Sequence, residues 1–248
     1  MVDRPPRLIV TNPASLPRTV RVTESLGIRR IQFSDAFIQG VMKVDDPDRL
    51  LLDYAHKMMA WIGFGLKPRM VLVIGLGAGS IVRFILRYFP NIFIDVVEID
   101  RRIIKVCHDK FLLPRSDPRL RVHFADGLEY VPDAARRGVR WDLILVDAYG
   151  ECPDDRGFGT PGFLRACAAV LEEQGMVVMN VIGRSSADRP HRGPLMESFG
   201  ANIRYMTATT ENNIIVMAGK NRHLDLPLAP HADEIAKLDL RSELWTFR

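Results

Sequence analysis

The sequence predicts an α/β protein with a doubly wound, mostly parallel seven-stranded sheet that ends in an antiparallel hairpin. Two observations lead to this fold class. From residue 69 onward, strand-like runs alternate with helical segments, and runs such as Met70-Val-Leu-Val-Ile are continuously apolar, as in parallel strands covered on both faces. The last two β-rich runs follow each other across a short Thr-Glu-Asn turn, without a helix between them.

A small N-terminal β-domain is expected over residues 1–46. Residues 1–17 are rich in Pro, Asn and Ser and are expected to lie loosely on the surface. Alternating residues on both sides of Gly27 predict a hairpin, and residues 40–44 fit a third short strand. The segment Asp45-Asp-Pro-Asp then predicts the start of a helix, with Pro47 in its first turn and apolar residues at helical spacing after it.

A larger α/β domain is expected over residues 47–220. Its predicted elements, in chain order, are strand 70–74, helix 81–89, strand 94–100, helix 101–111, strand 120–126, helix 127–137, strand 142–147, helix 161–173, strand 176–181 and the paired strands 202–209 and 213–218. Thr160 suits the N-cap of helix 161–173. Two prolines and a glycine leave a short helix or none over 185–194.

The remaining residues, 221–248, form a C-terminal tail that either folds back on the core or joins a partner. Its apolar candidates for such a contact are Leu238, Leu240, Leu244 and Trp245.

Composition narrows the class of protein. The chain has 248 residues, 47% hydrophobic and 26% charged, with a formal net charge of +4, and its cations are scattered. We interpret the densest runs, 4–30 and 136–140, as solvated surface, so no nucleic-acid partner is expected. Three cysteines without a CxxC pair predict neither a disulfide framework nor a zinc site. No signal-peptide pattern or membrane span is recognisable, so a cytoplasmic location is expected.

A glycine loop follows the first central strand. Gly75, Gly77 and Gly79 precede a helix, and such glycines let a ligand approach main-chain N–H groups. Glu98 ends the next strand, 23 residues after Gly75, where a carboxylate can accept both hydroxyls of a ribose. The alternative is that the glycines serve strand–helix packing alone.

Two further carboxylates end strands of the predicted sheet. Asp126, followed by Gly127, either faces an adenine ring or caps the next helix, and both roles are compatible. Asp147 follows a buried strand at the switch point, where ligands bind in such sheets. It either orients or deprotonates a nucleophile, or it is a cap or solvated turn residue.

Together these motifs resemble the spermidine synthase family, the polyamine aminopropyltransferases, which have the methyltransferase-like Rossmann fold. The resemblance covers about residues 18–219 and rests on the order of the motifs, which are Val71-Leu-Val-Ile-Gly-Leu-Gly-Ala-Gly-Ser, Val97-Glu-Ile-Asp, Asp126-Gly and Leu143-Ile-Leu-Val-Asp. Upstream, Phe33-Ser-Asp-Ala-Phe-Ile-Gln-Gly resembles the family's small β-domain. Tyr54-Ala-His resembles a helix with a tyrosine–histidine pair, in a register where only one of the two can match.

The resemblance implies a role for each matching residue. Glu98 would hold the ribose, Asp126 the adenine side and Gln39 the sulfur end of the nucleoside, while Asp147 would face the attacking amine. The acceptor-side candidates are Tyr54, His56, Tyr149 and Glu151. The donor would be S-adenosylmethionine or its decarboxylated form, the acceptor a small amine, and the protein a homodimer that needs no metal.

Two positions depart from the family pattern. Where the glycine loop of the family carries an aspartate that grips the aminopropyl amine, this chain has Ala78, and where a second aspartate holds the diamine, it has Gly150. Aminopropyl transfer in polyamine biosynthesis is the leading prediction. Methyl transfer from intact S-adenosylmethionine, which Ala78 favours, and a nucleoside-binding protein without turnover are the alternatives. An NAD(P)-dependent oxidoreductase ranks last, because Ser80 replaces the third glycine of its fingerprint.

Overall fold

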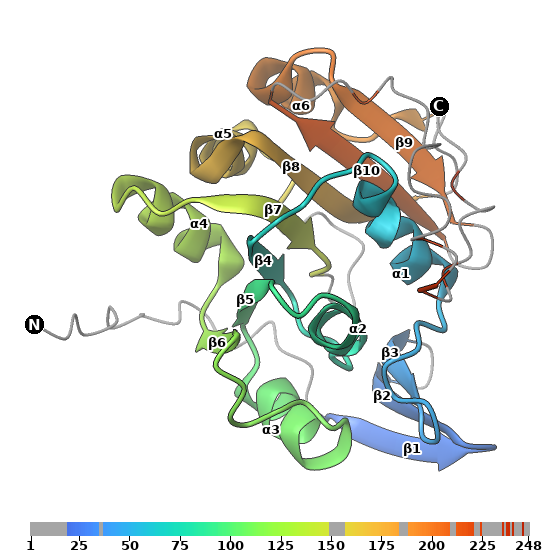
Figure 1. The fold of residues 1–248 in the computed structure, drawn as a ribbon. Coiled ribbons are helices and arrows are strands. Elements are labelled where there is room, and N and C mark those ends of the chain that lie inside the picture. Colours follow the sequence, from blue (N-terminus) through green and yellow to red (C-terminus); the bar gives the residue numbers. More distant parts are fainter. Residues whose placement is uncertain are drawn as a thin grey trace, which may run out of the picture.

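The strand-like runs form one seven-stranded sheet in the order β6-β5-β4-β7-β8-β10-β9 (Figure 1). Strands β6, β5, β4, β7 and β8, which are neighbours in this order, are parallel, and β10 pairs antiparallel with both β8 and β9. The strands are β4 (Met70–Ile74), β5 (Phe93–Glu98), β6 (Leu120–Phe124), β7 (Trp141–Val146), β8 (Leu171–Ile182), β9 (Ile203–Thr207) and β10 (Asn213–Gly219). The predicted mostly parallel sheet with a terminal antiparallel hairpin is confirmed.

This computed structural model describes part of the chain. The described residues are 19–34, 37–148, 157–183, 188–208, 212–220, Leu224, Ile235, Lys237, Leu238, Leu240 and Trp245. Residues 1–17, expected to lie loosely on the surface, fall outside them.

Helices cover both faces of the sheet (Figure 1). One face carries α1 (Asp53–Met58), the 3-10 helix η2 (Met59–Ile62), α2 (Ser80–Tyr88) and α3 (Arg101–Lys110); the other carries α4 (Gly127–Arg136), α5 (Pro161–Val170) and α6 (Arg192–Phe199). In β4, Val71 and Val73 belong to one buried cluster, and Leu72 and Ile74 to the other, because successive side chains of a strand point to opposite faces. Burial on both faces explains the continuously apolar runs.

A separate three-stranded antiparallel sheet lies beside the glycine loop. It consists of β1 (Arg21–Ser25), β2 (Ile28–Ser34) and β3 (Phe37–Lys43), and it contains the predicted hairpin and third strand. The Ser80 hydroxyl, at the start of α2, donates to the Val41 carbonyl at 2.7 Å. The small sheet is therefore attached where the central sheet presents its glycines.

Two predicted helix boundaries are wrong. No helix starts at residue 45: α1 begins at Asp53, and the Pro47 carbonyl instead accepts a hydrogen bond from Arg83 Nε. Helix α5 has the predicted Thr160 cap but ends at Val170, because Leu171 pairs with Trp141 and starts β8. Helix α6 (Arg192–Phe199) is short, as one of the two predicted alternatives allowed, and its eight residues begin within the proline-containing segment.

The described residues of the C-terminal tail lie on the core. Leu224, Ile235, Leu240 and Trp245 are buried in the cluster that contains α1 and α2. The Trp245 indole N–H donates to the His56 carbonyl at 2.9 Å, 189 residues away in sequence. For these residues, the first of the two predicted alternatives, folding back on the core, is confirmed.

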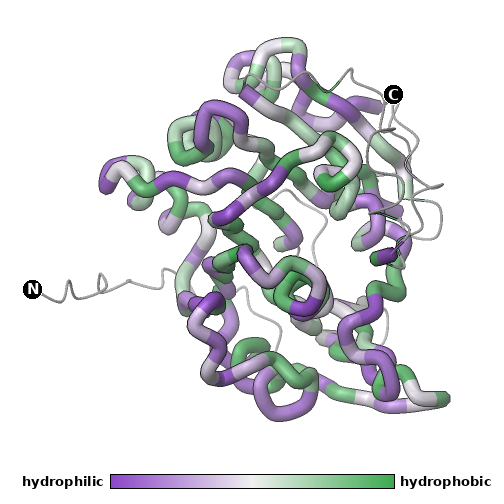
Figure 2. The backbone as a smooth tube through the Cα atoms, in the orientation of Figure 1, coloured by the Kyte–Doolittle hydropathy of each residue, from purple (hydrophilic) through white to green (hydrophobic). Residues whose placement is uncertain are grey.

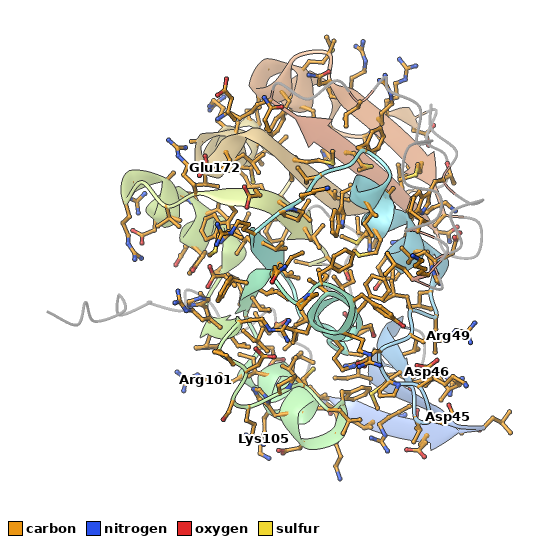
Figure 3. All side chains as sticks on the ribbon, in the orientation of Figure 1. Asp45, Asp46, Arg49, Arg101, Lys105 and Glu172 are labelled. Atoms are coloured by element: carbon orange, nitrogen blue, oxygen red, sulfur yellow. The ribbon has the colours of Figure 1, made fainter. Side chains whose placement is uncertain are left out.

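Apolar segments lie inside the molecule and charged side chains lie on its outside. Figure 2 shows hydrophobic stretches running through the middle of the molecule, with hydrophilic stretches along its outer turns. Figure 3 shows Arg49, Arg101 and Glu172 at separate points on the outside of the molecule. In the part of the chain that the structure describes, no helix combines the length and the apolar composition that crossing a membrane requires.

Candidate active site

Three neighbouring parallel strands bring the predicted chemical groups to one edge of the sheet. Strand β4 lies between β5 and β7, so Gly75, Glu98 and Asp147 all follow or end strands at the same carboxyl edge. The Gly75 N–H donates to the carbonyl of Val97, at the end of β5, at 2.8 Å, and the Asp147 N–H donates to the Ile74 carbonyl at 2.8 Å. These bonds fix the loop that follows β4 between the two carboxylates.

The glycine loop is shaped by close backbone approach. Gly75 has φ +90°, and a Cβ there would lie 2.1 Å from the Asp147 carbonyl oxygen, so no other residue fits. Gly77 has φ +52°, and its Cβ would lie 2.7 Å from the Gln39 carbonyl oxygen in β3. Gly79 is the left-handed N-cap of α2. The loop thus packs directly against strand β3.

Glu98, predicted to hold a ribose, accepts hydrogen bonds from the glycine loop and from the end of its own strand. It is 7% exposed; its Oε2 accepts from the Leu76 N–H at 2.9 Å and its Oε1 from the Asp100 N–H at 2.8 Å. Burial raises the pKa of Glu98 to about 7, and the two backbone hydrogen bonds oppose this rise. Each oxygen keeps a lone pair, so the carboxylate can still accept the two hydroxyls of a ribose.

Asp126 caps a helix, as one of its two predicted roles required. Its Oδ1 accepts from the Leu128 N–H at 2.9 Å at the start of α4, where Gly127 is the first helical residue. The contact of Asp126 and Gly127 with an adenine ring stays a prediction. The two roles remain compatible, because the second carboxylate oxygen is not needed for the cap.

Asp147 lies in a chain of hydrogen bonds that joins four elements. Its Oδ2 accepts from the Tyr54 hydroxyl of α1 at 3.2 Å, and its Oδ1 accepts from Asn180 Nδ2 of β8 at 2.8 Å. Asn180 Oδ1 in turn accepts from Asn213 Nδ2 of β10 at 2.7 Å. Burial raises the pKa of the Asp147 carboxyl, while the hydrogen bonds from Asn180 and Tyr54 lower it. Such a carboxylate is oriented and ready to accept a proton.

A pocket opens between the glycine loop and Asp147. Its lining includes Gln39 and Gly40 of β3, Tyr54 of α1, Ala78 of the loop, and Asp147. Gln39 and Tyr54 therefore line one pocket with Asp147, and their roles at the sulfur end of the nucleoside and on the acceptor side stay predictions.

His56 does not line this pocket. His56 is two residues beyond Tyr54, which turns it about 200° around the helix, and it is buried without lining the pocket. Of the tyrosine–histidine pair, the tyrosine is thus the member at the site. Tyr149 and Glu151, like Gly150, lie outside the described residues.

Sequence analysis missed Asn180, Asn213 and Arg83. Asn180 interrupts the apolar run of β8 near its carboxyl end, and a polar residue in a buried strand was the available signal. Arg83 is 3% exposed and lies beneath the glycine loop, where its Nη1 donates to the Ala78 carbonyl at 2.6 Å. Among the described residues, no group of three or more His, Cys, Asp or Glu side chains is placed to hold a metal ion.

The sequence is similar to a known protein family and to its members. The family model for the spermine/spermidine synthase domain matches residues 52–184. A polyamine aminopropyltransferase of Chromobacterium violaceum is 31% identical over 199 residues, which are 80% of this chain and 75% of the relative.

Two solved structures extend the similarity to the fold. Human methyltransferase-like protein 13, in complex with SAH, aligns with a TM-score of 0.66 at 26% identity, over 80% of this chain and 95% of that one. A probable spermidine synthase of Corynebacterium glutamicum aligns with a TM-score of 0.68 at 18% identity, over 81% of this chain and 76% of that one. The family match, the aligned relative and the motif order lead to one conclusion: this chain belongs to the spermine/spermidine synthase family.

Proposed function

We propose that this protein is an aminopropyltransferase of polyamine biosynthesis, which moves an aminopropyl group from decarboxylated S-adenosylmethionine to a small amine. The family match makes it a transferase, and its relatives are polyamine aminopropyltransferases. The observation that carries the proposal is the oriented, partly desolvated Asp147 at the mouth of the pocket, held by Tyr54 and Asn180.

The chemistry requires a free amine in line with the sulfonium. The amine nitrogen attacks the carbon next to sulfur, the C–S bond breaks, and methylthioadenosine leaves as a neutral thioether. An alkylamine has a pKa of about 10 and is protonated at neutral pH. A carboxylate whose pKa is raised by burial is a better proton acceptor than an exposed one, so Asp147 takes the proton of the amine.

The remaining site residues bind and position the donor. Glu98 accepts the ribose hydroxyls, Asp126 and Gly127 border the adenine, and the loop glycines let the nucleoside approach the main chain. Gln39 lies at the sulfur end. Tyr54 forms the acceptor side, together with Tyr149 and Glu151 by the family resemblance. We extend the proposal to a cytoplasmic homodimer.

Methyl transfer is a second candidate, and a specific observation favours it. Ala78 lines the pocket at the position where the family resemblance implies a carboxylate for the amine of the aminopropyl chain. A buried ammonium without a carboxylate partner is strongly disfavoured. Human methyltransferase-like protein 13, which is similar over most of its length, was solved with SAH.

Product analysis separates the two candidates. The purified protein is incubated with decarboxylated S-adenosylmethionine, or with the intact donor, together with putrescine, cadaverine or spermidine. Release of methylthioadenosine with an aminopropylated amine, absent in Asp147→Asn, supports the proposal. Release of S-adenosylhomocysteine with a methylated amine replaces it by the second candidate. Methylthioadenosine binding without any product refutes both and leaves a nucleoside-binding protein.

A further inference from the structure

The terminal hairpin brings a polar side chain to the candidate active site. Strand β10 is antiparallel to β8, so its first residue, Asn213, lies opposite Ile182, the last residue of β8, at the carboxyl edge of the parallel strands. The Asn213 carbonyl accepts from the Ala208 N–H at 2.8 Å across the β9–β10 hairpin, which fixes this end of the strand. A parallel strand in the place of β10 would begin at the opposite edge, far from Asp147.

Three polar side chains are neighbours on one face of the sheet at this edge. The register of β7 and β8 places Asp147 beside Asn180, and Asn213 is the diagonal neighbour of Asn180 in β10. The same face of these strands is otherwise apolar, with Val178 and Ile215 buried in the cluster that contains α1. Apolar groups of similar shape could replace a buried hydrogen-bonded pair at little cost in stability. The two amides therefore point to a role beyond holding the sheet together.

The hydrogen bonds of these side chains allow one orientation of both amides. An ionised Asp147 only accepts hydrogen bonds, so Asn180 must turn its Nδ2 toward it, at 2.8 Å. The Asn180 Oδ1 then faces β10 and accepts from Asn213 Nδ2 at 2.7 Å. If the Asn180 amide were turned over, oxygen would face the carboxylate and the two NH2 groups would face each other. Each hydrogen bond thus stabilises the next one.

The other neighbours of Asp147 leave this orientation important. Of the described side chains that hydrogen-bond to Asp147, Tyr54 of α1 is the titratable one, while β4, β8 and β10 face it with backbone groups or neutral amides. The charged residues Asp53 and Lys57 of α1 pair with each other at 2.8 Å. Burial raises the pKa of the Asp147 carboxyl, and the hydrogen bonds from Asn180 and Tyr54 lower it. An Asn180 amide that presented its oxygen would act in the opposite direction.

We propose that Asn213 is a positioning residue of the transfer reaction: it fixes the Asn180 amide with its N–H group toward Asp147, and so keeps the proton acceptor ionised and oriented. The inference rests on the proposed function and deepens it, because it assigns part of the readiness of Asp147 to the antiparallel hairpin. Neither asparagine lines the pocket beside the glycine loop, so both act through Asp147.

A titration of the Asp147 carboxyl in the ligand-free protein tests this role. Carbon-13 NMR of protein labelled at its aspartate carboxyls measures the pKa, and Asp147→Asn identifies the signal. Asn213→Asp replaces the donor by an acceptor, so the Asn180 amide should turn over and the pKa of Asp147 should rise by about one unit or more. Asn213→Leu, which is similar in size and uncharged, removes the donor alone and should raise this pKa by a smaller amount.

The matched control for the added charge is Asn212→Asp, at the exposed neighbouring position, which should leave the pKa of Asp147 unchanged. An unchanged pKa in both Asn213 variants overturns the inference. A rise in Asn213→Asp without any rise in Asn213→Leu also overturns it, because charge alone then explains the effect. If Asn213→Asp does not fold, Asn213→Leu decides.

Activity measurements separate this inference from the proposed function. In single-turnover assays, the acidic limb of the pH–rate profile should move to higher pH by the same amount as the pKa of Asp147, while methylthioadenosine affinity stays unchanged. A limb that stays in place although the pKa rises shows that Asn213 has no part in catalysis. Absence of turnover in the wild type refutes the proposed function, and the titration still decides whether Asn213 orients Asn180.

Discussion

Replacement of Glu98 by glutamine tests two properties of the buried carboxylate separately: its effect on the stability of the protein and its contribution to nucleoside binding. The pKa of Glu98 is raised by burial from 4.5 to about 7. Below pH 4.5 the group is protonated in both the folded and the unfolded state. As the pH rises from 4.5 to about 7, the unfolded state loses the proton first, so the free energy of unfolding falls until the folded state ionises as well.

The size of this loss follows from the two pKa values. With about 1.36 kcal/mol for each pKa unit, ionisation of Glu98 lowers the free energy of unfolding by about 2.5 kcal/mol between pH 5 and pH 8. Glu98→Gln does not titrate, and its amide oxygen can accept from only one of the two N–H donors, Leu76 or Asp100, that the carboxylate satisfies. The variant should therefore gain stability relative to the wild type as the pH rises, whatever the constant cost of the lost bond.

Urea denaturation of both proteins at pH 5 and pH 8, without ligand, measures how the difference in their free energies of unfolding changes with pH. Calorimetry with methylthioadenosine measures the function of the same group, and Glu98→Gln should weaken binding by about 1.5 kcal/mol, the scale of a hydrogen bond to a charged group. A stability difference that is the same at both pH values would refute the buried-carboxylate argument. Unchanged affinity in the folded variant would remove the ribose assignment.

Asp147→Asn should keep methylthioadenosine affinity and lower turnover by at least about 100-fold in single-turnover assays, since general-base catalysis contributes about 10²–10⁴; equal turnover would leave Asp147 as a structural residue. Tyr54→Phe removes a hydrogen bond that lowers the pKa of Asp147, so the acidic limb of the pH–rate profile should move to higher pH, and an unmoved limb contradicts the pairing. Gly40→Ala would place a Cβ 2.6 Å from Ala78 N, which should push β3 away from the loop and weaken donor binding. Gly162→Ala, where an added Cβ meets nothing within 4 Å, is the control, and equal donor affinity of the two variants argues against the contact between β3 and the loop.

The sheet was predictable because burial on both faces produces a pattern that can be recognised within a few consecutive residues. Runs such as Met70–Ile74 are apolar at every position, and they alternate with helices, so the order of elements can be inferred without any contact. Glu98 and Asp147 were predictable for the same reason, since a carboxylate directly after a buried strand lies at the carboxyl edge. The family resemblance then assigned roles to these positions.

The helix boundaries depended on partners far away in sequence. Arg83, 36 residues downstream, holds Pro47 outside a helix. Asn180 supports Asp147 only because β8 lies beside β7 in the folded sheet. Local patterns contain none of these pairings.

The departure at Ala78 has a structural counterpart in β3. A Cβ at Gly40 would lie 2.7 Å from Ala78 Cβ, so the Ala78 side chain faces the bare backbone of this strand. A carboxylate at position 78 would need the space that β3 occupies. The close contact of β3 with the loop and the loss of a negative charge above Arg83 are thus two effects of one small residue. Ala78 lines the same pocket as Asp147, but it takes no part in the hydrogen bonds that Asp147 accepts from Tyr54 and Asn180. Donor preference, measured before any acceptor is known, is therefore the most informative property of this protein, because it separates aminopropyl transfer from methyl transfer.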